Sequence, residues 1–75
     1  MFEVVGLKSV TAKSDGRRYV EIHTISDDKF VTGKRCDSFF IPEERVDYFD
    51  ALTIGALIDA LYNRFGRVER ITVFI

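Results

Sequence analysis

The sequence predicts a single, small and mostly β domain. The chain has 75 residues, a length typical of one compact domain. Runs rich in valine, isoleucine, threonine and aromatic residues are separated by turn-forming residues, which is typical of strands. Asp15-Gly16 lies between the first two runs, and Asp-Gly in that place indicates a β-hairpin. We therefore expect residues 1–75 to form one β-rich domain.

Three strands follow from this pattern. Residues 2–12 form the first strand, and Gly6 within it predicts a bulge or a bend. Residues 18–26 form the return strand of the hairpin, and residues 35–41 form the third principal strand. Residues 30–32 are expected to extend the sheet between the second and third strands.

A proline after the third strand predicts a short helix from Pro42 to about Asp50. Proline lacks the N–H that the first turn of a helix leaves unpaired. Glu43 and Glu44 would meet the positive end of the helix dipole. We expect this helix to direct Val46 toward the core.

Residues 52–66 allow two interpretations. Their apolar residues recur at intervals of three and four, as in a helix, but the segment contains a glycine and two β-branched residues, which are poor helix formers. The alternation over residues 58–62 suits a strand, followed by a turn at Asn63–Gly66 and a last strand over residues 68–75. Both interpretations need Gly66 at positive φ. We favour the hairpin.

The hairpin interpretation gives the element order β-β-β-α-β-β. This is the order of a small five-stranded barrel of the OB type, with one short helix between strands three and four. The helical interpretation gives β-β-β-α-β, which is a compact α+β domain. The order of elements does not decide between them.

Composition limits the cellular setting and the partners. The single cysteine, Cys36, excludes an internal disulfide and fits a reducing compartment, so a cytoplasmic location is expected. No secretory signal and no apolar run near the ~20 residues of a membrane span are present, so no membrane association is expected. The net charge of −1 argues against strong non-specific binding to nucleic acid. A homodimer is expected because so short a chain buries little surface alone.

The sequence does not predict an enzyme, a metal site or a cofactor. His23 is the only histidine, whereas a metal site requires three or four ligands. No glycine-rich phosphate loop, dinucleotide motif or Ser-His-Asp set is recognisable. The adjacent acids Asp27-Asp28 and Glu43-Glu44 are explained by a turn and by a helix dipole.

Three segments resemble a pattern in small, uncharacterised proteins of phages and integrative elements of Gram-positive bacteria. The segments are Cys36–Ile41, Leu52–Gly55 and Tyr62–Val68, the last matching Tyr-Asn-Arg-Phe-Gly-(Lys/Arg)-Val. The resemblance covers about half of the chain and supports the hairpin interpretation. The sequence departs from the pattern at Ala60, where a larger β-branched residue is usual, and in its acidic balance.

A weaker similarity is to the single-stranded-DNA-binding proteins of filamentous phages, which are small dimeric OB-type domains. It lies in Gly16–Tyr19 after the flexible turn and in the later Leu52–Gly55. This similarity implies an OB-type fold and binding to a single strand.

Two groups of residues combine what single-strand binding requires, namely aromatic rings for base stacking and cations for the phosphates. The candidate residues are Arg17, Arg18, Tyr19, Arg64, Phe65 and Arg67. The alternative is that the tyrosine packs on the sheet and the arginines only solubilise the turns. One of the adjacent rings Phe39-Phe40 must also point outward from its strand, where it could stack or dimerise.

The function expected from these groups is non-catalytic binding of single-stranded nucleic acid by a phage or mobile-element protein. A second hypothesis is a regulatory or protein-interaction module that docks a host or element protein, either through an acidic helix or as a homodimer. The residues of that acidic helix would be Glu43, Glu44, Asp47 and Asp50. A purely structural oligomerisation domain is the third hypothesis.

Overall fold

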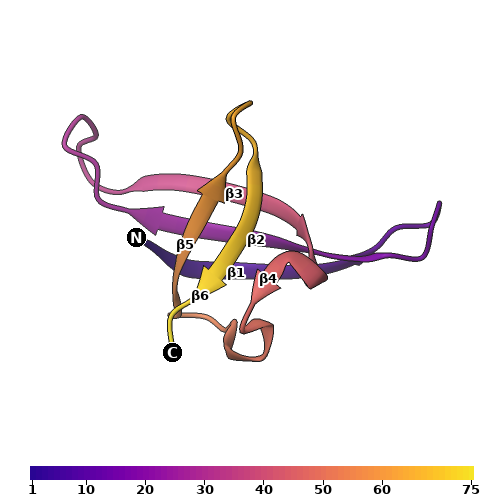
Figure 1. Ribbon diagram of the computed structural model, residues 1–75. Helices are drawn as coiled ribbons and strands as arrows, with labels where there is room; N and C mark the ends of the chain where they lie inside the picture. The colour runs from indigo at the N-terminus through magenta and orange to yellow at the C-terminus, as the bar shows by residue number, and fades with distance from the viewer.

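The computed structural model describes residues 1–75 and contains one six-stranded sheet (Figure 1). The strands are β1 (Phe2–Thr11), β2 (Arg18–Ser26), β3 (Arg35–Pro42), β4 (Val46–Asp47), β5 (Leu57–Tyr62) and β6 (Val68–Val73). Their order in the sheet is β3-β2-β1-β5-β6-β4, and all neighbours are antiparallel except β4 and β6. The prediction of a mostly β fold is confirmed.

The sheet bends so that the β5–β6 hairpin crosses the three strands β1, β2 and β3 (Figure 1). β1 joins the two parts, because Phe2 and Glu3 pair with β5 while most of the strand pairs with β2. The register of β1 against β2 shifts between Val4 and Gly6, which confirms the predicted bulge. A Cβ at Gly6 would lie 3.3 Å from the Cβ of His23, so a glycine allows this close approach.

The core lies between these crossing layers. Alternate residues of each strand point inward, as the twofold period of a β-strand requires. Phe2 closes one side of the core, where its ring and the Phe39 ring pack edge to face with centroids 5.2 Å apart. Nine hydrophobic residues are buried: Val4, Val20, Ile22, Phe39, Ile41, Val46, Ile58, Ile71 and Val73.

The expected five-stranded barrel of the OB type does not form. The sheet has six strands and stays open, with β3 at one end and β4 at the other. The outer edge of β6 is taken by β4, since Val46 pairs with Ile71 and Asp47 pairs with Thr72. This pairing competes with any closure of β6 onto β3.

The expected helix from Pro42 to about Asp50 is also wrong. Two short 3₁₀ turns, Glu43–Arg45 and Phe49–Ala51, flank β4 instead. The left-handed conformation of Tyr48, with φ of 61°, separates β4 from the second turn. Pairing with β6 and burial of Val46 outweigh the local helix signals. No helix in the structure has the length and apolar character needed to cross a membrane.

Residues 58–62 form a strand, so the helical interpretation and its compact α+β domain are wrong. The turn to β6 is held by Asn63, whose backbone carbonyl accepts a hydrogen bond from the N–H of Gly66 at 3.0 Å. The side-chain Oδ1 of Asn63 accepts from the N–H groups of Phe65 at 2.9 Å and Arg67 at 3.1 Å. Gly66 has φ of 76°, as expected.

Residues 30–32 do not extend the sheet. They belong to the loop between β2 and β3, in which the side chain of Asp28 accepts a hydrogen bond from the N–H of Phe30 at 2.9 Å. This Asx turn reverses the chain before the sheet resumes at Arg35. Phe30 is therefore left 85% exposed.

Candidate nucleic-acid interface

An aromatic pair lies on the outer face of β2 and β3. Burial of Val20 on the inner face directs its neighbour Tyr19 outward. The register places Tyr19 opposite Pro42, and hence diagonal to Phe40. The two rings stack with centroids 5.0 Å apart and an angle of 5° between their planes. Phe40 is 60% exposed, so its ring remains accessible to a ligand.

Arg17 extends this pair. Its guanidinium carbon lies 5.7 Å from the centroid of the Tyr19 ring, within the range of a cation–π contact. Arg17, Tyr19 and Phe40 thus form a continuous group that contains a cation and two rings. The alternation of the sequence predicts that either Phe39 or Phe40 points outward, and the structure selects Phe40.

The two arginines at the start of β2 have acidic partners. The Nη2 of Arg17 donates a hydrogen bond to the Glu44 carboxylate, and the Nε of Arg18 lies 3.6 Å from Oε1 of Glu43. The hydrogen bond to Glu44, and then the charge of Glu44, raise the pKa of Arg17 above its ordinary value. These cations are therefore partly neutralised within the protein.

The second group occupies the tip of the β5–β6 hairpin. Arg64 and Arg67 form no ion pair in the structure. Phe65 is 73% exposed, and the guanidinium carbon of Arg64 lies 4.9 Å from its ring centroid. The hydrogen bonds from Phe65 and Arg67 to the Asn63 side chain fix the turn that presents these residues. The tip thus offers an exposed ring and two cations without carboxylate partners.

The structure assembles the six predicted residues into two groups and does not join them. Arg17, Arg18 and Tyr19 lie along the β1–β2 hairpin, while Arg64, Phe65 and Arg67 lie at the β5–β6 tip. In Figure 1 the first hairpin extends to the right and the second points upward, so their ends are well separated. A ligand that contacts both groups must be extended.

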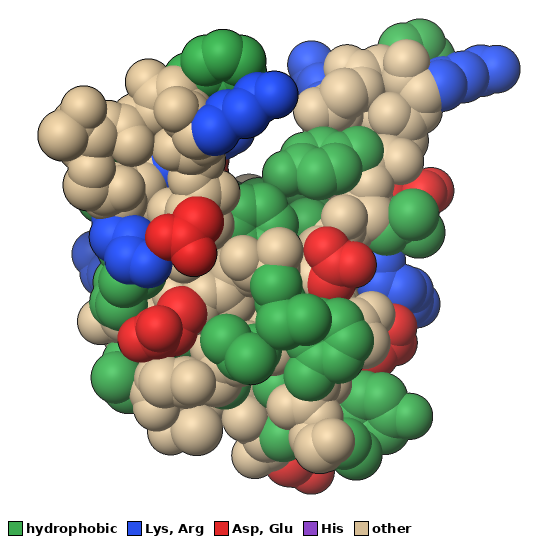
Figure 2. Space-filling view, turned by 90° about the vertical axis from the view of Figure 1, so that its left-hand side faces the viewer, with side chains coloured by type: hydrophobic (Ala, Val, Ile, Leu, Met, Phe, Trp, Pro, Cys, Tyr) green, Lys and Arg blue, Asp and Glu red, His purple; other side chains and the backbone are tan.

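Apolar side chains are exposed on the outer side of the β5–β6 hairpin. Leu57 is 43% exposed, Leu61 is 60% exposed and Phe74 is 48% exposed. Figure 2 shows one face of the molecule, on which hydrophobic side chains gather below two projections that carry lysine and arginine.

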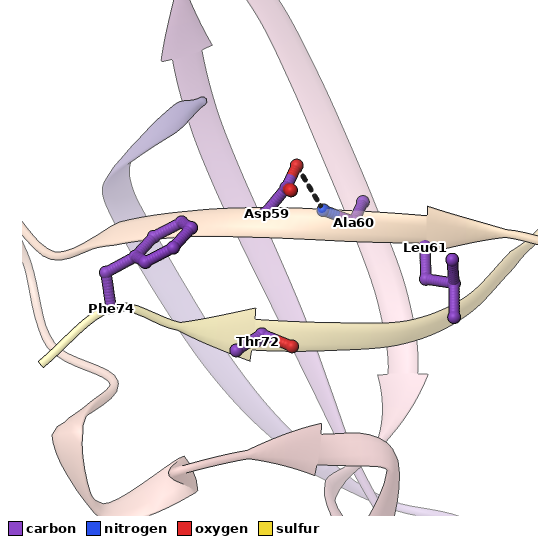
Figure 3. A pocket seen from close by; sticks show the side chains of 5 residues that line it. All are labelled: Asp59, Ala60, Leu61, Thr72 and Phe74. Carbon is purple, nitrogen blue, oxygen red and sulfur yellow. Dashed lines mark hydrogen bonds between the residues drawn. The ribbon is translucent and has the colours of Figure 1, made fainter.

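A shallow depression of about 340 Å³ lies beside β5 and β6 (Figure 3). Its lining consists of Asp59, Ala60, Leu61, Thr72 and Phe74. In Figure 3 the ring of Phe74 lies beside β5, and the Asp59 carboxylate accepts a hydrogen bond from the N–H of Ala60 at 3.0 Å. The lining is mainly apolar and contains a carboxylate, so it suits a protein surface better than a phosphate. The sequence does not predict this depression, because its lining depends on the pairing of β5 with β6.

A hydrogen-bonded chain crosses the outer face of β2 and β3. Nε2 of His23 lies 2.8 Å from Oε2 of Glu21, and Nδ1 of His23 lies 3.3 Å from Oγ of Ser38. Cross-strand register brings His23 opposite Ser38, a proximity that linear spacing does not reveal. None of the three surface depressions is lined by these side chains. No group of three or more His, Cys, Asp or Glu side chains is arranged to hold a metal ion.

No protein-family model, curated protein or solved structure matches this chain. Any functional assignment therefore depends on the side chains and their geometry.

Proposed function

We propose that this protein binds single-stranded nucleic acid without catalysing a reaction, and that it serves a phage or another mobile element. The observation that carries the proposal is an exposed aromatic ring close to an arginine, which occurs at two separate places, on the outer face of β2 and β3 and at the tip of the β5–β6 hairpin. Phe40 belongs to the first group and is joined to Arg17 through Tyr19. Phe65 belongs to the second and contacts Arg64 directly. Bases stack on such rings, and arginines bind the phosphates between them.

The strand order supports this proposal. β3-β2-β1-β5-β6 follows the order of neighbours in an OB-type barrel, with the final pairing between the last strand and the third left unmade. OB-type domains bind oligonucleotides on the face of strands two and three and with the loops after the first and fourth strands. The corresponding regions of this chain are the Tyr19–Phe40 face, the β1–β2 hairpin and the β5–β6 tip.

The expected affinity is moderate. Each stacked base contributes about 1–3 kcal/mol, so Phe40 and Phe65 together would contribute about 2–6 kcal/mol. Arg64 and Arg67 add phosphate contacts whose strength falls as salt rises. With a net charge of −1, the protein gains little from long-range attraction. Binding is therefore expected to be strongest at low salt.

Fluorescence anisotropy with a labelled oligothymidine, at salt concentrations from about 50 to 200 mM, tests the proposal. We expect saturable binding that weakens with salt. Phe65→Ala and Phe40→Ala should each weaken it about 5- to 160-fold, the equivalent of one lost stacked base at about 1–3 kcal/mol. Phe74→Ala removes an exposed ring outside both groups and should leave the affinity unchanged. Absence of binding at the lowest salt would refute the proposal.

A homodimer is the second candidate function. The observation that favours it is the exposed apolar surface formed by Leu57, Leu61 and Phe74. Sedimentation velocity of the wild-type chain should then show a dimer, and Phe74→Ala should shift it toward monomer while Phe65→Ala does not. A wild-type chain that sediments as a monomer at high concentration would eliminate this candidate.

Docking through an acidic helix loses its structural basis. The segment that carries the acids does not form a helix. Glu43 and Glu44 face Arg18 and Arg17, and Asp47 is 3.2 Å from the guanidinium of Arg70. Three of the four acids are thus occupied within the chain.

A further inference from the structure

The two glutamates after β3 form ion pairs with the arginines of the first aromatic group. Glu43 and Glu44 open the 3₁₀ turn that follows Pro42, and this turn lies against the start of β2. Together with Arg17 and Arg18 they line a depression of about 260 Å³ that contains no hydrophobic residue. Two guanidinium groups thus face two carboxylates in one open site.

The two ion pairs are unequal. Arg17 and Glu44 share a hydrogen bond, and both side chains are well exposed. Arg18 and Glu43 are 3.6 Å apart without a hydrogen bond, and the Glu43 side chain is only 18% exposed. Oε2 of Glu43 is buried and has no hydrogen-bond donor. Burial of a carboxylate oxygen costs free energy when no donor replaces the lost water. Glu43 therefore pays this cost and is held only by the weak contact with Arg18.

These features make the site exchangeable. The exposed Arg17–Glu44 pair contributes little to stability, because water and salt compete with it, and the Arg18–Glu43 contact lacks a hydrogen bond. Carboxylate and phosphate oxygens accept hydrogen bonds from the same guanidinium N–H groups. A phosphodiester held close to the Tyr19–Phe40 pair could therefore replace a glutamate without any change in the strands.

We infer that Glu43 and Glu44 are internal competitors of nucleic-acid phosphates and withhold Arg17 and Arg18 from weakly bound ligands. The inference rests on the proposed function and specifies how that site is regulated. Arg64 and Arg67, which have no acidic partner, make the first phosphate contacts. Arg17 and Arg18 become available only to a ligand whose bases also stack on Phe40, and this requirement favours single strands over duplexes.

The double variant Glu43→Gln/Glu44→Gln tests the competition. Glu69→Gln is the matched control for its charge, because Glu69 is exposed and forms no ion pair. The change in binding free energy on Glu69→Gln, doubled, gives the effect expected from removing any two negative charges. By anisotropy, the double variant should bind oligothymidine at least about five-fold more tightly than this expectation. The slope of the logarithm of its binding constant against the logarithm of salt concentration should also be steeper by about 1.4, because each of two added phosphate contacts to a single strand contributes about 0.7. Equal effects per charge removed would overturn the inference.

A second measurement is independent of nucleic acid. Pyrophosphate is titrated into the wild type and the double variant, and the Nε–H resonances of Arg17 and Arg18 are followed by ¹H–¹⁵N NMR. We expect saturable changes in the chemical shifts of these resonances, with a midpoint at a several-fold lower pyrophosphate concentration in the double variant than in the wild type. Identical titrations would overturn the inference even if oligothymidine binds. The expected difference in pyrophosphate binding, with no oligothymidine binding by any variant, would retain the internal competition and refute the proposed function.

Discussion

Replacing Gly66 by alanine tests whether the β5–β6 tip depends on a left-handed residue. Gly66 has φ of 76°, and a Cβ built there meets no atom within 4 Å. A steric clash therefore contributes nothing, and the expected loss in the free energy of unfolding comes only from the conformation of the backbone. A left-handed conformation costs a residue with a Cβ about 1–2 kcal/mol, and alanine recovers part of this by restricting the unfolded chain. We expect a net loss of about 1 kcal/mol in the free energy of unfolding.

Thermal unfolding followed by far-ultraviolet circular dichroism measures this loss. A decrease of about 4–8 °C in Tm corresponds to 1 kcal/mol in a domain of this size. Gly66→Asn is the control, because asparagine tolerates the left-handed region and should lose less stability. A Gly66→Ala variant as stable as the wild type, or an asparagine as destabilising as alanine, would refute the need for a left-handed residue at this position. Binding by Phe65 is expected to weaken together with the turn.

Two further predictions concern the core and an exposed ion pair. Ile71 is fully buried, so Ile71→Ala should lower the free energy of unfolding by about 2–5 kcal/mol and Ile71→Val by about 0.5–1.5 kcal/mol, as measured in urea. The hydrogen bond and then the charge of Lys34 lower the pKa of Asp27. Because the folded pKa lies below the unfolded value of about 4, the stabilisation is present above that pH and is lost as pH falls through the folded pKa. Asp27→Asn should therefore lower Tm slightly at neutral pH, and its Tm should converge with that of the wild type in acid; a constant difference at all pH values would contradict this.

The turns of the fold could be predicted from the sequence, because their conformation depends on the residues within them. Asp15-Gly16 and Asn63–Gly66 carry the residues that their turns require, so both hairpins follow from the sequence. Pro42-Glu43-Glu44 carries equally strong local signals for a helix, yet no helix forms. The difference is that both hairpins bury apolar residues when they fold as the local signals direct, whereas Val46 is buried by pairing with β6.

The candidate site was predicted as a set of residues without their contacts. Arg17 and Arg64 each lie close in sequence to an aromatic residue, so their contacts with Tyr19 and Phe65 follow from proximity along the chain. Arg17 and Glu44 are 27 positions apart, and only the folded chain brings them together. The outward orientation of Phe40, in place of Phe39, likewise depends on which face of β3 meets the core.

The mostly β character, the bulge at Gly6 and the two hairpin turns follow from the sequence, because each depends on neighbouring residues. The open sheet and the replacement of a helix by β4 follow from tertiary contacts, because both depend on the pairing of Val46 with Ile71. Tertiary contacts also determine which arginines are neutralised. Ion pairing depends on distance in space, and the acids that pair with Arg17 and Arg18 are remote from them in the chain.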